Sequence, residues 1–117
     1  MPTISKFHLY NAGGFDAWLG VIWIDSQGMQ HGPVWDPKGY RIPAAQNGYF
    51  DIGNISLAPG VTVWCAVYVY SGYDLYGTAQ DGGGLIYKAG DAHTANYTSH
   101  GTTLNDWLTF DNVTPAT

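Results

Sequence analysis

Glycine and proline interrupt this chain so often that no long segment keeps a helical pattern. Sixteen glycines and six prolines are spread through 117 residues. No stretch of ten or more residues repeats its apolar positions at intervals of three and four. All the acidic residues are aspartate and none is glutamate, which favours turns, where the short carboxylate bonds to the nearby backbone. The sequence therefore predicts an all-β protein.

The clearest strand candidate spans residues 61–70. Valines and Cys65 alternate there with a second set of positions that includes Trp64, Tyr68 and Tyr70. Successive side chains of a strand point to opposite faces of the sheet, so one face is aliphatic and the other largely aromatic. We expect the aliphatic face, with an inert Cys65, to lie in the core.

The other strand-like segments are separated by turn residues at intervals of about ten residues. They cover residues 7–10, 17–24, 49–57, 85–88, 95–99 and 103–110. We expect residues 11–14 to close a hairpin between the first two segments, and His100-Gly101 to close one between the last two. Residues 29–48 hold too many glycines and prolines for a central strand, which leaves a long loop or an edge strand.

About seven short strands predict a single domain folded as an antiparallel β-sandwich, with a small β-barrel as the alternative. Hydrophobic residues make up 45% of the chain, enough to build a core without disulfides or metals. The length suits one domain, covering residues 1–117.

Charge excludes one large class of partner. Lysine and arginine number only 4, the net charge is −5 and charged residues are 11% of the chain. Nucleic-acid binding needs clustered cations to neutralise phosphates, so we expect no nucleic-acid partner. The same shortage removes electrostatic attraction to anionic membranes but leaves the insertion of aromatic side chains open.

Hydropathy predicts no transmembrane segment, because no run of eighteen apolar residues occurs. The N-terminal residues also lack the apolar run of a signal peptide. We therefore expect a cytoplasmic protein, or one exported without a classical signal peptide.

Catalytic patterns are missing from the sequence. There is no Gly-x-Ser-x-Gly elbow, no phosphate-binding glycine loop, no His-Glu-x-x-His pair and no glutamate for an acid–base dyad. No two histidines have a short metal-ligand spacing, and the single Cys65 excludes both an intrachain disulfide and a cysteine-rich zinc site. We expect a protein that is not an enzyme and that carries no metal or other cofactor.

Aromatic residues are 15% of the chain and gather in two loop-like segments, residues 34–40 and 71–77. Sugar rings pack on aromatic faces, while their hydroxyl groups need acceptors such as aspartate. Low charge suits a neutral glycan or glycoconjugate as the partner. The predicted binding residues are Trp35, Asp36, Tyr40, Tyr73, Asp74, Tyr76 and Asp81.

Two other functions use the same aromatic residues. A membrane-active or toxin-like β protein would place exposed tryptophan and tyrosine at a lipid interface. A structural self-assembly module would instead cover the aromatic face of residues 61–70 with another copy of the chain. Repeated weak sites and this face both favour a homo-oligomer.

Overall fold

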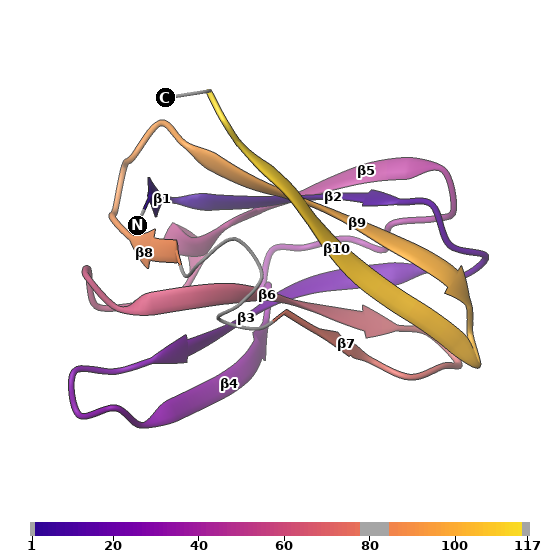
Figure 1. The fold of residues 1–117 in the computed structure, drawn as a ribbon, viewed down its shortest axis with the longest axis horizontal. Coiled ribbons are helices and arrows are strands. Elements are labelled where there is room, and N and C mark those ends of the chain that lie inside the picture. Colours follow the sequence, from indigo (N-terminus) through magenta and orange to yellow (C-terminus); the bar gives the residue numbers. More distant parts are fainter. Residues whose placement is uncertain (1, 78–84, 116–117) are drawn as a thin grey trace.

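The computed structural model describes residues 2–77 and 85–115, which form two β-sheets packed face to face (Figure 1). The first sheet has the order β1 (Thr3–Ile4), β8 (Leu85–Tyr87), β6 (Thr62–Val69), β3 (Ala17–Ile24) and β4 (Gln30–Trp35), with β7 (Leu75–Tyr76) also paired to β6. The second has the order β10 (Asn105–Thr114), β9 (Thr94–Thr102), β2 (Lys6–Asn11) and β5 (Gln46–Asp51). One 3₁₀ turn, η1 (Ile52–Asn54), follows β5.

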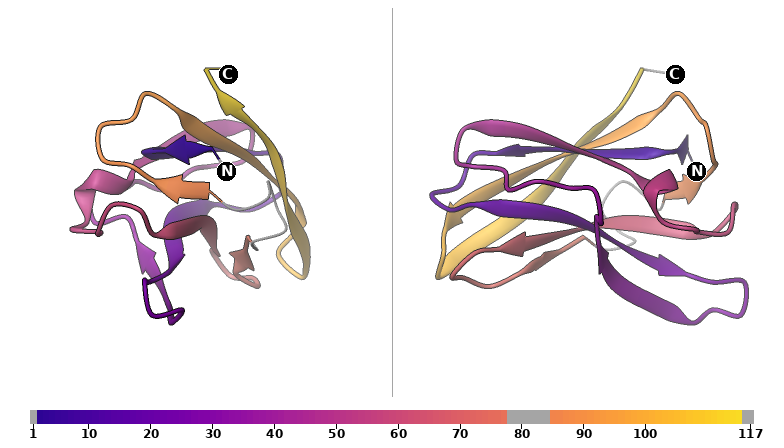
Figure 2. Two further views of the ribbon diagram at one scale, coloured as in Figure 1. Left: turned by 60° about the vertical axis from the view of Figure 1, so that its left-hand side comes forward. Right: turned by 180° about the vertical axis from the view of Figure 1, so that it is seen from behind.

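The predicted all-β sandwich is confirmed. The two layers are seen from the side in Figure 2, and neither sheet closes into a barrel within the described residues. Most strand pairs are antiparallel, whereas β2–β9 and β1–β8 are parallel, so both sheets are mixed.

The core lies between the sheets and is built from alternate residues of the long strands. Phe7 of the second sheet packs edge-on against Phe50, with ring centroids 6.3 Å apart, and against Tyr97 at 5.7 Å. From the first sheet, Val63 and Cys65 are fully buried. The predicted aliphatic face of residues 61–70 therefore faces the core, as expected.

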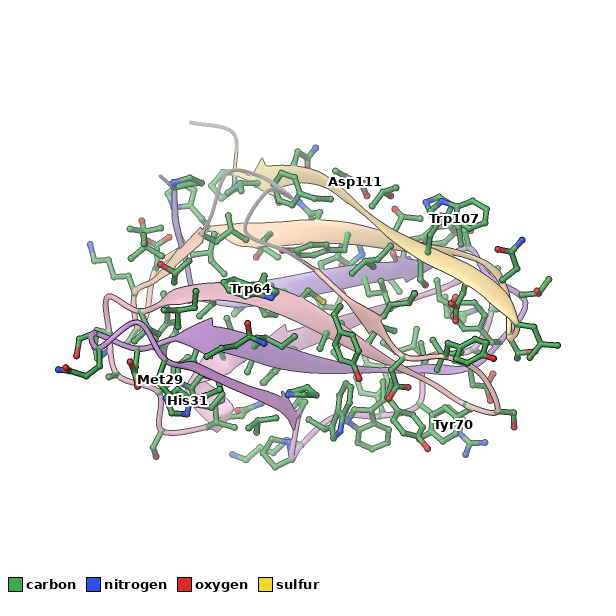
Figure 3. The ribbon with its side chains drawn as sticks, turned by 60° about the horizontal axis from the view of Figure 1, so that its bottom comes forward. Met29, His31, Trp64, Tyr70, Trp107 and Asp111 are labelled. Carbon is green, nitrogen blue, oxygen red and sulfur yellow. The ribbon has the colours of Figure 1, made fainter. Side chains whose placement is uncertain are left out.

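The outer face of the first sheet carries a second apolar cluster. Ile22, Trp64 and Ala66 are buried there, with Ile24 and Trp35 packed against them. Figure 3 shows Trp64 on this sheet. The outer face of the first sheet is therefore apolar around this cluster, and a ligand or partner can be sought there.

The expected hairpin at residues 11–14 is wrong, because β2 and β3 belong to different sheets. The Asn11 side chain accepts the N–H of Gly13 at 3.0 Å and donates to the carbonyl oxygens of Phe15 and Ile42 at 2.6 and 3.1 Å. This buried amide turns the chain locally and leads it across to the other sheet.

The second expected hairpin exists, but its turn was placed wrongly. β9 continues through His100 and Gly101, and the chain turns at Thr103 and Leu104. Gly101 has a φ of +96°, and a Cβ there would lie 2.1 Å from the carbonyl oxygen of Asn105, so glycine is needed inside the strand rather than at a turn.

Two segment boundaries also differ from the prediction. The strand expected at 49–57 is β5 over Gln46–Asp51, which ends where the Asp51 carboxylate accepts the N–H of Gly53 at 2.9 Å and starts η1. Within residues 29–48, β4 lies at the edge of the first sheet, in agreement with the edge-strand alternative.

Candidate functional site

One end of the sandwich is formed by three neighbouring connections, which we call the loop end: residues 12–16, 70–74 and 103–104. The backbone N–H of Tyr73 donates to the carbonyl oxygen of Thr103 at 3.2 Å. The N–H of Tyr70 donates to the carbonyl oxygen of Asp16 at 3.0 Å. These backbone bonds hold connections from distant parts of the chain side by side.

Apolar side chains project from the loop end. Leu104 is 75% exposed and Tyr73 is 67% exposed, the two highest values for large hydrophobic side chains in the described part of the chain. Tyr70 and Trp107 lie toward this end, whereas Met29 lies toward the other (Figure 3). A hollow of about 430 Å³ at the loop end is lined by Tyr68, Val69, Ser71, Gly72, Tyr73, Asp74 and Leu104.

Arg41, which contacts residues of the loop end, is already partnered. The Arg41 guanidinium lies 4.0 Å from the centre of the Tyr70 ring, and its Nη1 atom is 3.5 Å from an Asp16 carboxylate oxygen. The Arg41–Asp16 pair carries no net charge, so it adds little attraction for an anionic surface.

Two carboxylates lie beside the exposed side chains of Leu104 and Tyr73. Asp74 accepts the backbone N–H of Val69 at 3.0 Å, which closes the 70–74 connection. Asp106, two residues after Leu104, has a buried Oδ2 atom without a hydrogen-bond partner among the described residues. Burial raises the pKa of Asp106, and the charge of Asp74 raises it further.

A second hollow adjoins the loop end on the outer face of the first sheet. We call it the aromatic cleft; it has a volume of about 310 Å³ and is lined by Trp18, Trp35, Tyr68 and Tyr70. The Trp35 and Tyr68 rings meet at 83° with centroids 5.6 Å apart, and Tyr68 meets Tyr70 at 78° and 5.0 Å. Because these rings stand nearly perpendicular, they form walls rather than a closed stack.

Two glycines and one backbone carbonyl group shape the aromatic cleft. A Cβ at Gly20 would lie 2.5 Å from the Trp35 ring, and one at Gly39 would lie 2.8 Å from the Trp18 indole nitrogen. The Trp18 indole N–H donates to the Asp36 carbonyl oxygen at 3.0 Å. Both indoles can therefore lie against the backbone only where a side chain is missing.

A third hollow lies further along the same face. It has a volume of about 520 Å³ and is lined by Ile22, Ile24, Gln30, Pro33, Trp64, Tyr76 and Gly77. The outer face of the second sheet combines exposed aromatic rings, such as Tyr49, with polar groups that bond to one another. His8, for example, lies 2.9 Å from the Asn96 side-chain oxygen and 2.7 Å from that of Asn47.

The structure spreads the predicted binding residues over several places. Tyr73 and Asp74 line the hollow of the loop end, Trp35 lies in the aromatic cleft and Tyr76 lines the third hollow. Tyr40 is exposed in the connection after β4. Glycan binding by these residues stays a prediction.

The remaining two predicted binding residues are Asp36, which is buried, and Asp81. Asp36 is only 3% exposed, and its carboxylate accepts the N–H of Lys38 at 3.0 Å and the side-chain amide of Asn54 at 3.3 Å. It therefore holds in place the connection that begins directly after Trp35. Asp81 lies outside the described residues.

Sequence reasoning did not select Leu104, Trp18, Tyr68 or Tyr70 as site residues. The period-two aromatic positions of residues 61–70 were a signal for the two tyrosines. Leu104 had none, because the turn between β9 and β10 was expected elsewhere and this leucine was assigned to a strand.

Within residues 2–77 and 85–115, no group of three or more His, Cys, Asp or Glu side chains is placed to hold a metal ion. No helix there is long and apolar enough to cross a membrane.

Comparison with known proteins gives no family for this chain. No family model matches the sequence, and no curated protein matches it. Among solved structures the fold is similar to toxin domains at low identity.

The similarity to pneumolysin has 16% identity, 91% coverage of this chain, 23% coverage of that chain and a TM-score of 0.47. The membrane-binding domain of pneumolysin has 14% identity, 92% coverage of this chain, 95% coverage of that domain and a TM-score of 0.43. The cytotoxin suilysin from Streptococcus suis has 19% identity, 92% coverage of this chain, 23% coverage of that chain and a TM-score of 0.39. The chain thus spans about a quarter of the whole toxins, and its function has to be sought in its own residues.

Proposed function

We propose that this chain is a membrane-interface binding domain of toxin-like type that inserts its loop end into neutral lipid surfaces. The observation that carries the proposal is the pairing of Leu104 with Tyr73. The two most exposed large hydrophobic side chains in the described part of the chain sit on neighbouring connections, which the Tyr73–Thr103 hydrogen bond joins. Single exposed hydrophobic residues are common on protein surfaces, but two joined at one tip form a patch.

The chemistry of the tip suits the boundary between lipid and water. Leu104 has an apolar side chain that can leave water, and Tyr73 has an apolar ring with a polar hydroxyl, as in the aromatic belts of membrane proteins. The hydrogen bonds of the loop end are made before any membrane is met, so insertion needs little reordering of the backbone.

The negative net charge of the chain favours neutral lipids over anionic ones. The chain carries a net charge of −5, and Arg41 near the tip is paired with Asp16. Binding through apolar contact does not depend on anionic headgroups and is little affected by salt.

Magnitudes indicate that one copy binds weakly. Burying a leucine or aromatic side chain contributes about 1.5–3 kcal/mol, so two side chains give about 3–6 kcal/mol, a Kd between several millimolar and tens of micromolar. Useful affinity therefore requires several copies acting together, which supports the expectation of a homo-oligomer.

A matched pair of variants tests the proposal on vesicles of phosphatidylcholine. Leu104→Ser removes the apolar tip, and Met29→Ser makes a similar change in a 61% exposed side chain toward the other end of the sandwich. We expect Leu104→Ser to lower vesicle cosedimentation about tenfold or more. Met29→Ser should leave it unchanged. Equal binding by both variants, or no binding by the unaltered protein, would contradict the proposal.

Binding of a neutral glycan is the second candidate, and the hollow of the loop end favours it. Ser71, Tyr73 and Asp74 line that hollow together and combine a ring with hydroxyl and carboxylate groups. A glycan array separates the candidates. Selective glycan signals that Tyr73→Ser abolishes, without vesicle binding, would favour the glycan function.

A further inference from the structure

We propose that the aromatic cleft binds a quaternary ammonium group, the cationic part of choline. This goes beyond membrane insertion by the loop end and does not depend on it. Trimethylammonium groups occur both in choline lipids and in soluble choline compounds, and the cleft chemistry is the same for both.

The walls of the cleft are the first argument. Every lining residue is aromatic: Trp18 comes from β3, Trp35 from β4, and Tyr68 and Tyr70 from β6 and the residues that follow it. Ring faces attract cations through their negative quadrupole, most strongly for tryptophan, and aromatic cages are used to recognise quaternary ammonium ligands. The volume of about 310 Å³ is at the small end of ordinary ligand pockets.

Charge is the second argument. The Tyr70 ring already holds one cation, the Arg41 guanidinium, at 4.0 Å. An Asp16 carboxylate oxygen lies 3.5 Å from Arg41 and balances its charge, so Arg41 does not strongly repel a second cation. The net charge of −5 attracts cations to the protein as a whole.

The third argument is that the lining offers few polar groups, namely two tyrosine hydroxyls and two indole N–H groups, and this distinguishes the ligand from a sugar. The Trp18 indole N–H is used by the Asp36 carbonyl oxygen. The Asp36 carboxylate is buried and accepts two hydrogen bonds from its surroundings. A sugar needs partners for several hydroxyl groups, whereas a trimethylammonium group has no hydrogen-bond donor to satisfy.

The cleft is also preformed. Trp35 lies where Gly20 leaves room, and Trp18 lies against Gly39. A larger side chain at either glycine would displace an indole, so the positions of both indoles depend on these glycines. Little conformational entropy is then lost when a ligand enters.

Titration with three soluble probes tests the proposal, using tryptophan fluorescence and calorimetry on the intact chain. The probes are choline, its uncharged carbon isostere 3,3-dimethylbutan-1-ol, and a panel of neutral methyl pyranosides. We expect choline to bind at least about fivefold more tightly than the isostere, because only choline carries the charge. Equal affinities for choline and the isostere, binding of a pyranoside without choline, or no binding by any probe would overturn the proposal.

Variants locate the binding in the cleft. Tyr68→Leu removes one ring, and Tyr49→Leu makes the same change in an exposed tyrosine on β5, in the other sheet. We expect at least about fivefold weaker choline binding for Tyr68→Leu and none of this loss for Tyr49→Leu. Tyr68→Phe keeps the ring and should keep the affinity. Loss of affinity in Tyr68→Phe, or retention in a folded Tyr68→Leu, would contradict an aromatic cation site.

Vesicles distinguish the two sources of the ligand. A preference for phosphatidylcholine over phosphatidylethanolamine that soluble choline removes identifies lipid headgroups, and choline binding without that preference identifies soluble compounds. The vesicle variant Leu104→Ser should still bind choline. Failure of the cleft proposal therefore shows in the choline titration, and failure of membrane insertion shows only with vesicles.

Discussion

The backbone N–H of Tyr73 donates a hydrogen bond to the carbonyl oxygen of Thr103, at 3.2 Å. This bond joins the connection between β6 and β7 to the turn between β9 and β10. It places the Tyr73 ring beside Leu104, so that two side chains 31 positions apart in the sequence form one apolar tip.

Gly72 allows the two connections to approach. A Cβ at this position would lie 2.4 Å from the Thr103 carbonyl oxygen, so Gly72→Ala should push the connections apart. We expect a loss of about 1–3 kcal/mol in the free energy of unfolding, measured with denaturant, and weaker vesicle binding. The matched control is Gly14→Ala, where the nearest contact of a Cβ is an ordinary 3.8 Å. An equal effect of the two substitutions would show that this close approach is not needed.

Asp106→Asn should stabilise the protein at neutral pH. The Asp106 carboxylate has a raised pKa because it is partly buried, so its charged form is disfavoured in the folded state. Folding stability should therefore improve as pH falls and the group takes up a proton, and the advantage of the asparagine variant should shrink in parallel. Denaturant midpoints at pH 7 and pH 4 measure this. A stability advantage of Asp106→Asn that grows toward low pH would contradict a raised pKa of Asp106.

Asp91 should show the opposite pH dependence. A hydrogen bond from Thr3 and the backbone N–H of His93 lower the pKa of Asp91 from its usual 3.8 to about 2. The unfolded chain then binds more protons than the folded one between these values, so this contribution to stability is present above pH 3.8 and is lost as pH falls toward 2. Asp91→Asn should flatten the stability curve in that window. An unchanged slope between pH 4 and pH 2 would exclude Asp91 as its source.

Cys65 should resist thiol reagents in the folded protein. Its side chain is fully buried, and burial raises the pKa of the thiol, so the reactive thiolate is scarce. Labelling should proceed in denaturant and be far slower in buffer. Rapid stoichiometric labelling of the native protein would place Cys65 at the surface.

Patterns contained within one strand could be predicted from the sequence. The alternation of valine with aromatic residues predicted both the position of β6 and the burial of Cys65. It could do so because successive side chains of one strand point to opposite faces of the sheet. The aromatic outer face that later forms the cleft was visible in Tyr68 and Tyr70 for the same reason.

Features that depend on distant partners could not be predicted in this way. Residues 11–14 resemble a hairpin turn, yet Asn11 bonds to the carbonyl oxygen of Ile42 and the chain crosses to the other sheet. The cleft depends on Gly20 and Gly39 leaving room for indoles from other segments, which no local pattern reveals. Leu104 became a tip residue only because β9 extends past Gly101.

A probe at position 104 tests insertion of the loop end most directly. Because Cys65 is buried, Leu104→Cys can be labelled selectively with an environment-sensitive fluorophore, and Met29→Cys provides the control toward the other end. With phosphatidylcholine vesicles, the emission of the label at position 104 should shift to shorter wavelength and become protected from an aqueous quencher, while the label at position 29 should stay in water. A label at position 104 that remains water-exposed on vesicles to which the protein is bound would contradict insertion through Leu104 and Tyr73.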